Sequence, residues 1–284
     1  MKTTSNSKIN IMNSLSHKSV LIHICDIFML IFIIFPIIIV IQISISPSSQ
    51  DPSGYTLVWN DDFNDKTLDT SKWSKENRHP QSLNNELEIY IPDEVYIEDG
   101  TLILRSEKKN YQGYNYTSGS VISRDKFFQK YGWFEIRAKL PEGKGIWPAF
   151  WLVPNDRLWP PEIDVFELLG HDTRKIYMTN HWECENPSKA TLSCFNQEDY
   201  MISDLNVPDF SSDYHTFAIE WQPGLIRWII DGKERFRSTL YVPDIPMYLY
   251  LNTAVGGNWP GDPDSTVVFP QYYYIDYVRV YNKI

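Results

Sequence analysis

The chain has 284 residues, of which 43% are hydrophobic and 22% charged, and this balance excludes a disordered or fibrous protein. The 36 acidic residues outnumber the 26 basic ones, and the net charge of −10 argues against binding to the phosphates of a nucleic acid. Aromatic residues make up 15% of the chain, more than a core of this size needs. We therefore expect some of them to line a binding surface for a neutral ligand.

A strongly apolar segment lies near the amino terminus, where residues 27–41 are all apolar. The stretch 20–45 is typical of a signal peptide or of an uncleaved signal anchor. A buried core helix is less favoured, because the segment is long and hydrophobic all round. Cleavage and anchoring both fit the segment.

The charges around this segment predict its orientation. The lysines Lys2, Lys8 and Lys18 precede the segment, and no comparable group of basic residues follows it directly. Residues 1–19 are therefore expected to be a cytosolic tail or a signal n-region, residues 46–53 a linker, and residues 54–284 an exported domain. The protein would be extracellular, either secreted or held at the membrane as a type II protein.

Export predicts an oxidising environment for two of the three cysteines. Cys184 and Cys194 have nine residues between them, and we predict that they form a disulfide, with two free thiols as the alternative. Asn115 begins an Asn-Tyr-Thr sequon, which is either a glycosylation site or an unused match.

Short strands follow one another through residues 54–284. The clearest is 132–140, where apolar residues alternate with charged ones in the period of a half-buried strand. Branched and aromatic residues predict further strands at 101–104, 216–221, 226–230 and 272–281, and Asp231-Gly232 predicts a hairpin turn. No amphipathic helix of useful length is evident, so we predict an all-β fold, a two-sheet antiparallel β-sandwich.

Residues 159–167 carry the most unusual pattern in the chain. Glu162, Asp164 and Glu167 lie among apolar residues of a predicted strand, although like charges on one sheet face repel each other. On a regular strand Glu167 would point away from the other two carboxylates. A β-bulge at Val165-Phe166 would bring all three to the same face, and bulges are common beside active sites.

Two glutamates on one concave face can cleave a glycosidic bond. A retaining enzyme needs a nucleophile and an acid/base whose carboxyl groups are about 5 to 5.5 Å apart. Asp164, between the two, could share a proton with the nucleophile and separate their titrations. The alternative is a structural one, an acidic edge strand exposed to solvent.

Several ordered motifs share one resemblance. They are LVWNDDF at 57–63, NNELE at 84–88, YGWFE at 131–135, GIWPAFW at 145–151, EIDVFE at 162–167, NHW at 180–182, DYHT at 213–216, AVGGNWPG at 254–261 and IDYVRVY at 275–281. Over nearly the whole predicted exported part, the sequence resembles glycoside hydrolase family 16, and within it the laminarinase-like endo-1,3-β-glucanases.

The resemblance implies a β jelly roll with a concave substrate cleft for β-glucan, and cleavage with retention of configuration. It implies that Glu162 is the nucleophile, Asp164 the assisting acid and Glu167 the general acid/base. The substrate-binding residues that it implies are Asn85, Arg124, Trp147, Trp151, His181 and Trp259. No cofactor is required for the chemistry, but a structural Ca²⁺ is implied at Asp62, Gly100 and Asp276, with Asp62 in place of the more usual Glu.

Strand alternation and neighbouring residues divide the other aromatic and histidine side chains. We expect Trp133, Trp221 and Trp228 in the core and His171 and His215 in structural roles. Tryptophans next to Pro, Gly or the acidic residues are cleft candidates, namely Trp147, Trp159, Trp182 and Trp259. A zinc site is not favoured, because no histidine pair has a helical ligand spacing.

The favoured function is an endo-acting β-glucanase that is a monomer. A transglycosylase that rejoins glucan chains is the first alternative, because a sugar hydroxyl can replace water in the second step. A non-catalytic glucan-binding protein is the second, and the paired glutamates argue against it.

Overall fold

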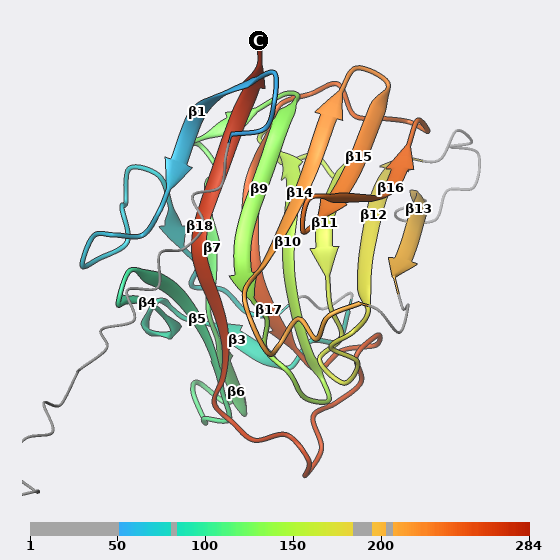
Figure 1. The fold of residues 1–284 in the computed structure, drawn as a ribbon. Helices are drawn as coiled ribbons and strands as arrows, with labels where there is room; N and C mark the ends of the chain where they lie inside the picture. Colours follow the sequence, from blue (N-terminus) through green and yellow to red (C-terminus); the bar gives the residue numbers. More distant parts are fainter. Residues whose placement is uncertain (1–50, 81–83, 184–194, 203–206) are drawn as a thin grey trace, which may run out of the picture. The chain divides into compact units, whose positions relative to one another are not determined.

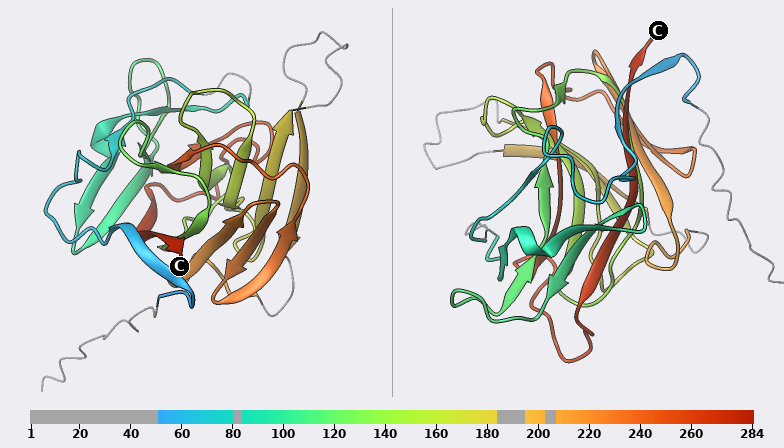
Figure 2. Two further views of the ribbon diagram at one scale, coloured as in Figure 1. Left: turned by 90° about the horizontal axis from the view of Figure 1, so that it is seen from above. Right: turned by 90° about the vertical axis from the view of Figure 1, so that its left-hand side faces the viewer.

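The computed structural model describes residues 51–80, 84–183, 195–202 and 207–284. These residues form two β-sheets, and in Figure 1 the sheet with β9, β14 and β18 lies in front of the sheet with β10, β11 and β17. Figure 2 shows the same two layers from above and from the side. The predicted all-β, two-sheet sandwich is confirmed.

The first sheet has ten strands. Their order is β16 (Lys233–Ser238), β15 (Leu225–Ile230), β14 (His215–Gln222), β9 (Gly132–Lys139), β18 (Gln271–Lys283), β5 (Thr101–Glu107), β6 (Tyr116–Ser118) and β3 (Glu88–Tyr90), while β1 (Tyr55–Asp61) also pairs with β18 and β4 (Val95–Glu98) with β5. One pair departs from the predicted antiparallel pattern, because β3 and β6 run parallel.

The second sheet has eight strands. Their order is β13 (Phe195–Ile202), β12 (Ile176–Glu183), β11 (Glu162–Glu167), β10 (Ile146–Pro154), β17 (Met247–Val255), β7 (Ser120–Ile122) and β2 (Ser74–Lys75), and β8 (Phe128–Gln129) also pairs with β17. The pairs in this sheet are antiparallel.

Alternating side chains build the core between the sheets. Along β9, buried residues alternate with half-buried ones as the sequence predicts, and Phe134 and Ile136 are fully buried. Trp221 and Trp228 lie in the core as predicted. Trp133 does not, because it is in phase with the polar residues of β9 and is only half-buried.

The Asp231-Gly232 turn joins β15 to β16 as predicted. Asp231 has a φ of 50° and Gly232 one of 72°, the left-handed conformations that a tight two-residue hairpin requires.

Within the described residues, the one helix is the short 3₁₀ turn η1 (Pro92–Glu94), so no helix there could span a membrane. The apolar segment 27–45 and both cysteines of the predicted disulfide lie outside the described residues, so these remain predictions. Asn115 is exposed in the loop before β6.

Candidate active site

The three carboxylates lie on β11, and the predicted bulge is confirmed. Asp164 pairs with Trp151 on β10 while Phe166 pairs with Phe150, so Val165 has no partner in this register. The register to β12 also shifts between Asp164 and Glu167. The extra residue restores Glu167 to the face that carries the other two carboxylates.

A hydrogen bond holds the backbone at this bulge. The indole Nε1 of Trp228, from the opposite sheet, donates to the carbonyl oxygen of Asp164 at 2.7 Å. Both groups are buried, so the bond also satisfies a carbonyl that the irregular ladder would leave without a partner.

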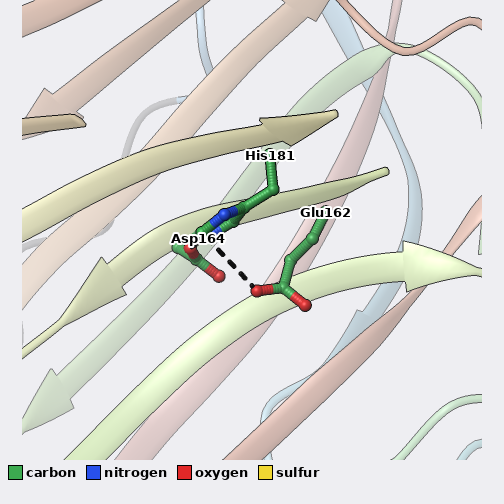
Figure 3. Close-up of side chains that lie close together, drawn as sticks. All are labelled: Glu162, Asp164 and His181. Carbon is green, nitrogen blue, oxygen red and sulfur yellow. Dashed lines mark hydrogen bonds and ion pairs between the residues drawn. The ribbon is translucent and has the colours of Figure 1, made fainter. Parts of the chain in front are cut away.

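Glu162, Asp164 and His181 converge in Figure 3. His181 is the β12 partner of Glu162, and its Nε2 lies 3.0 Å from Asp164 Oδ2 and 3.5 Å from Glu162 Oε1. Asp164 is only 2% exposed. The imidazole therefore lies where it can contact both acids.

An indole group orients each glutamate. Trp159 Nε1 donates to Glu162 Oε2 at 2.8 Å, and Trp147 Nε1 donates to Glu167 Oε1 at 2.9 Å. Each indole bonds only one of the two carboxyl oxygens of its glutamate, so it can orient the carboxyl group while the other oxygen remains available to react.

Burial and mutual repulsion make the trio hard to ionise completely. Burial, followed by the negative charge of Asp164, raises the pKa of Glu162 to about 8, and burial raises the pKa of Asp164 to about 8. The pKa of Glu167 is raised well above its usual range by burial and then by the charges of Asp164 and Glu162. At neutral pH the trio therefore retains protons, and a general acid is available.

We expect Glu162→Gln to raise Tm by about 5 °C at about pH 9 and to change it little at about pH 4. The folded-state pKa of Glu162 is raised to about 8 from the ordinary 4.5, so its stabilising contribution is complete below that ordinary value and is lost as pH rises through 8. Glutamine does not ionise, so the variant does not lose this stability as pH rises.

Thermal unfolding across this pH range checks the prediction. Glu98→Gln, at an exposed position on the ten-stranded sheet, is the control and should leave the pH dependence as in the wild type. A Glu162→Gln curve parallel to that of the wild type would contradict the assigned burial.

A cleft of about 980 Å³ contains all three carboxylates. It extends from β12, through Thr179, to the residue after β2, Glu76, and thus crosses six neighbouring strands. At about 4.8 Å per strand spacing, this width is roughly 24 Å. The cleft is long enough for an extended polymer rather than a small molecule.

Period-two alternation on two central strands forms the cleft floor. Trp147, Ala149, Trp151 and Val153 of β10 line the cleft, and so do Tyr248, Tyr250, Asn252 and Ala254 of β17. The intervening residues belong to the core, among them Phe150, Leu152, Leu249 and Leu251. Both strands are apolar and aromatic because one face of each packs in the core and the other lines the cleft.

The structure brings five of the six predicted substrate-binding residues into the cleft. They are Arg124, Trp147, Trp151, His181 and Trp259. Asn85 is not among the lining residues, because its exposed side chain bonds Asn258 at 2.8 Å, while its neighbours Asn84 and Glu86 line the cleft. A left-handed backbone at Asn85, with a φ of 55°, breaks the alternation there.

A polar network that the sequence motifs do not predict lies at one end of the cleft. Tyr250 stacks on Trp151 with ring centroids 4.1 Å apart, and Trp151 Nε1 donates to Asn252 Oδ1 at 2.8 Å. Arg78 donates to the Tyr250 hydroxyl and pairs with Glu76 at 3.0 Å. The alternation of tyrosine and asparagine in 247–255 was the available signal.

Two further tryptophans were cleft candidates. Trp159 lines the cleft. Trp182 does not, because it follows His181 on β12 and so points to the opposite face, where it is 9% exposed and stacks on Tyr241 at 5.0 Å.

The residues implied for calcium do not fit a calcium site as arranged. The register of β18 with β1 and β5 places Asp62, Gly100 and Asp276 close in the sheet. However, Asp62 pairs with Arg279 at 2.7 Å and Asp276 with Arg137 at 2.6 Å. A cation would have to compete with both guanidinium groups.

Among the described residues, the trio of Figure 3 is the group that could hold a metal. The ligand atoms of Glu162, Asp164 and His181 all lie within 4.8 Å of one another. Two members of this group, Glu162 and Asp164, are also expected to take part in glycosidic-bond cleavage, which needs no ion.

Paired glutamates on one face of a long, aromatic and polar cleft are the arrangement of a glycoside hydrolase. Residues 67–279 match the model of glycosyl hydrolases family 16. The catalytic domain of a laminarinase from Thermotoga maritima MSB8 has a TM-score of 0.72 and 39% identity, over 81% of this chain and 99% of that one.

Two relatives are similar in sequence. The glucan endo-1,3-beta-glucosidase A1 of Niallia circulans is 34% identical over 278 residues, covering 84% of this chain and 39% of that protein. The beta-glucanase of Rhodothermus marinus is 33% identical over 266 residues, covering 84% and 89%. The chain thus spans well under half of the first relative and most of the second. It belongs to glycosyl hydrolases family 16.

Proposed function

We propose that this chain is a retaining, endo-acting hydrolase of β-1,3-linked glucan. The observation that carries the proposal is the bulged strand β11, which directs Glu162 and Glu167 to one face of the cleft with Asp164 between them. A retaining mechanism needs two carboxyl groups in this relation.

In the first step, a carboxylate oxygen of Glu162 attacks the anomeric carbon of the sugar. Glu167 donates its proton to the glycosidic oxygen, the bond between that oxygen and the anomeric carbon breaks, and the leaving chain departs as an alcohol. The raised pKa of Glu167 keeps this proton available at neutral pH. The product is a glycosyl ester of Glu162.

In the second step, Glu167 accepts a proton from water, and the water oxygen attacks the anomeric carbon from the side opposite Glu162. The ester bond between that carbon and Glu162 breaks, which releases the sugar and returns Glu162 to its carboxylate form. Asp164 contributes by sharing a proton with Glu162, with which it is hydrogen-bonded. His181 contacts both acids and holds them in position.

Cleft length and lining support an internal cut in a neutral polymer. Tryptophan and tyrosine rings can pack against the apolar faces of sugar rings, while Asn252, Arg124 and Asn84 can bind hydroxyl groups. The similarity to the laminarinase and to the endo-1,3-glucosidase supports the β-1,3 linkage.

A product assay tests the proposal. The protein is incubated with laminarin, mixed-linkage glucan, agarose and xyloglucan, and we expect laminarin to release oligosaccharides of several lengths whose new ends initially have the β configuration by NMR. Products longer than the starting oligosaccharides would instead indicate a transglycosylase. No cleavage of laminarin, with rapid cleavage of another polymer, would contradict the linkage.

The proposal includes export. The apolar segment 27–41 and the lysines before it support a domain that faces the lumen or exterior. In intact vesicles from a eukaryotic host, we expect the carboxyl-terminal domain to be protected from added protease. Digestion of that domain from the cytosolic side would show the opposite orientation.

A further inference from the structure

Two glutamates outside β11 are fully buried, and their surroundings differ. Glu94 lies 2.5 Å from Arg105 Nε and 3.7 Å from Lys109 Nζ, and it accepts a hydrogen bond from Thr117 Oγ1 at 2.7 Å. Cationic and hydroxyl partners offset the burial of its charge, as in a structural ion pair. Glu88 has no comparable set of cationic and hydroxyl partners.

Glu88 lies on β3 and is 0% exposed. Its Oε2 accepts a hydrogen bond from the backbone N–H of Val255 at 2.8 Å. Its Oε1 is buried and receives no hydrogen bond from an N–H or hydroxyl donor of another side chain among the described residues. A buried carboxylate that has only backbone N–H donors and no cationic partner is unfavourable, whereas a carboxylic acid needs only an acceptor for its O–H.

The side chain of Glu86 supplies that acceptor. Glu86 is two residues before Glu88 and lines the cleft, where Asn84 Nδ2 donates to its Oε1 at 3.0 Å. Burial first, and then the charge of Glu86 together with a hydrogen bond to it, raise the pKa of Glu88 well above its usual range. The proton thus lies on the buried acid and the negative charge on the acid at the cleft.

From this geometry we propose that Glu88 is a positioning residue: as a buried carboxylic acid it donates to Glu86 and holds that carboxylate at the cleft wall, where Glu86 binds a hydroxyl of the glucan chain. The inference rests on the proposed function, because it takes a hydroxyl-rich polymer as the occupant of the cleft. It assigns a role to a residue that does not line the cleft itself.

The position of this pair suits a hydroxyl contact away from the cleaved bond. The N–H of Leu87 donates to the carbonyl of Val255 at 2.8 Å, which places residues 86–88 beside the end of β17. Strand β17 is two strands from β11, and Val255 lies three residues along β17 from Asn252, the residue in register with Glu167 through Ala149, so the pair lies roughly 14 Å from Glu167 and further from Glu162. A sugar hydroxyl donated to an anionic oxygen forms a stronger hydrogen bond than one donated to a neutral group.

Other ionisable groups lie beyond the pair. Tyr90 is two residues after Glu88 on β3, and the guanidinium of Arg78 lies 4.5 Å from the centre of the Tyr90 ring. Arg78 in turn donates hydrogen bonds to Glu76 and to the Tyr250 hydroxyl, so this guanidinium is already paired with groups other than Glu86 and Glu88.

Four variants separate positioning from simple support of the fold. Glu88→Gln keeps an acceptor for the Val255 N–H and an N–H donor for Glu86, while Glu88→Met keeps the volume and loses both. Glu86→Gln removes the anion. Glu94→Gln is the matched control, because it alters the other fully buried glutamate at a structural site.

The readouts are KM and kcat on the polysaccharide cleaved best, and on a short aryl glycoside that fills only the catalytic end. We expect Glu86→Gln and Glu88→Met each to raise the polysaccharide KM about 10-fold with little change in kcat. The double variant that combines Glu86→Gln with Glu88→Met should have a polysaccharide KM no higher than that of either single variant. Glu88→Gln should restore a wild-type KM, the aryl glycoside should be unaffected throughout, and Glu94→Gln should lower Tm without changing KM.

Equal losses on both substrates, or additive effects in the double variant, would overturn the inference. A measurement without substrate covers the case in which Glu88→Met does not fold. The infrared difference spectrum of wild type minus Glu88→Gln at neutral pH should contain a protonated carboxyl band, and its absence would also overturn the inference. If the proposed function itself is wrong, the wild type will cleave no glucan, and this outcome differs from each of the results that would overturn the role of Glu88.

Discussion

Glu162→Gln is expected to lower kcat on laminarin by about 10⁴-fold or more, while laminarin binding survives. The amide keeps the shape of the carboxyl group and one acceptor for the Trp159 indole N–H, so the cleft should be unchanged. It lacks the charge that attacks the anomeric carbon. Initial rates and isothermal titration with laminarin oligosaccharides measure the two quantities.

The stability prediction for the same variant makes a loss of activity interpretable. A variant that is inactive, binds glucan and melts above the wild type at high pH has lost chemistry rather than structure. Turnover within about tenfold of the wild type would exclude Glu162 as the nucleophile.

Azide provides a second check on the covalent route. In Glu162→Gly the vacated space can admit a small anion, which would attack the anomeric carbon directly. We expect a glycosyl azide of inverted configuration from an activated aryl glycoside. Azide should give no such product with the Glu162→Gln variant, because the amide still fills the space.

The catalytic strand was predictable because of residue parity. Glu162 and Asp164 are two apart and Glu167 is three further on, so only an irregular strand places all three on one face. The predicted bulge at Val165-Phe166 is the one that the structure contains. Local sequence therefore carried the main feature of the site.

The same parity rule would have prevented two wrong predictions. Trp133 alternates with Phe134 and is in phase with Glu135, so it belongs on the outer face of β9, where its Nε1 donates to Glu135 at 3.1 Å. Trp182 follows His181 directly, and adjacent strand residues cannot both face the cleft. In both cases the position of the residue along its strand, and not its residue type, decides which face it occupies.

Other features depend on contacts between distant segments. Nothing local indicates that β3 pairs in parallel with β6, or that Glu88 meets the backbone of Val255, which lies 167 residues away. Asn85 lies outside the cleft lining because its own left-handed backbone interrupts the alternation of its segment. Strand periodicity predicts which face a residue occupies, but it does not identify the segment that this face meets.

Glu167→Ala is expected to abolish laminarin cleavage nearly completely, by about 10³-fold or more, while an activated aryl glycoside still forms the glycosyl-enzyme. A natural leaving group must receive a proton as the bond breaks, whereas an activated phenol leaves as an anion and needs little help. The variant lacks that acid but keeps Glu162. The aryl glycoside should therefore release a burst of phenol followed by slow turnover, because Glu167 is also the base for the second step.

The pH dependence provides the matching control. Wild-type kcat/KM on laminarin should follow a bell-shaped profile, in which the acidic limb reports ionisation of Glu162, whose pKa is raised to about 8. The basic limb reports loss of the Glu167 proton, because the pKa of Glu167 is raised well above its usual range. In Glu167→Ala the burst should lose that basic limb, because the group that titrates there is gone. Equal rate losses on laminarin and the activated glycoside would show that Glu167 is not the acid, and would remove the functional reason for the bulge that turns it toward the cleft.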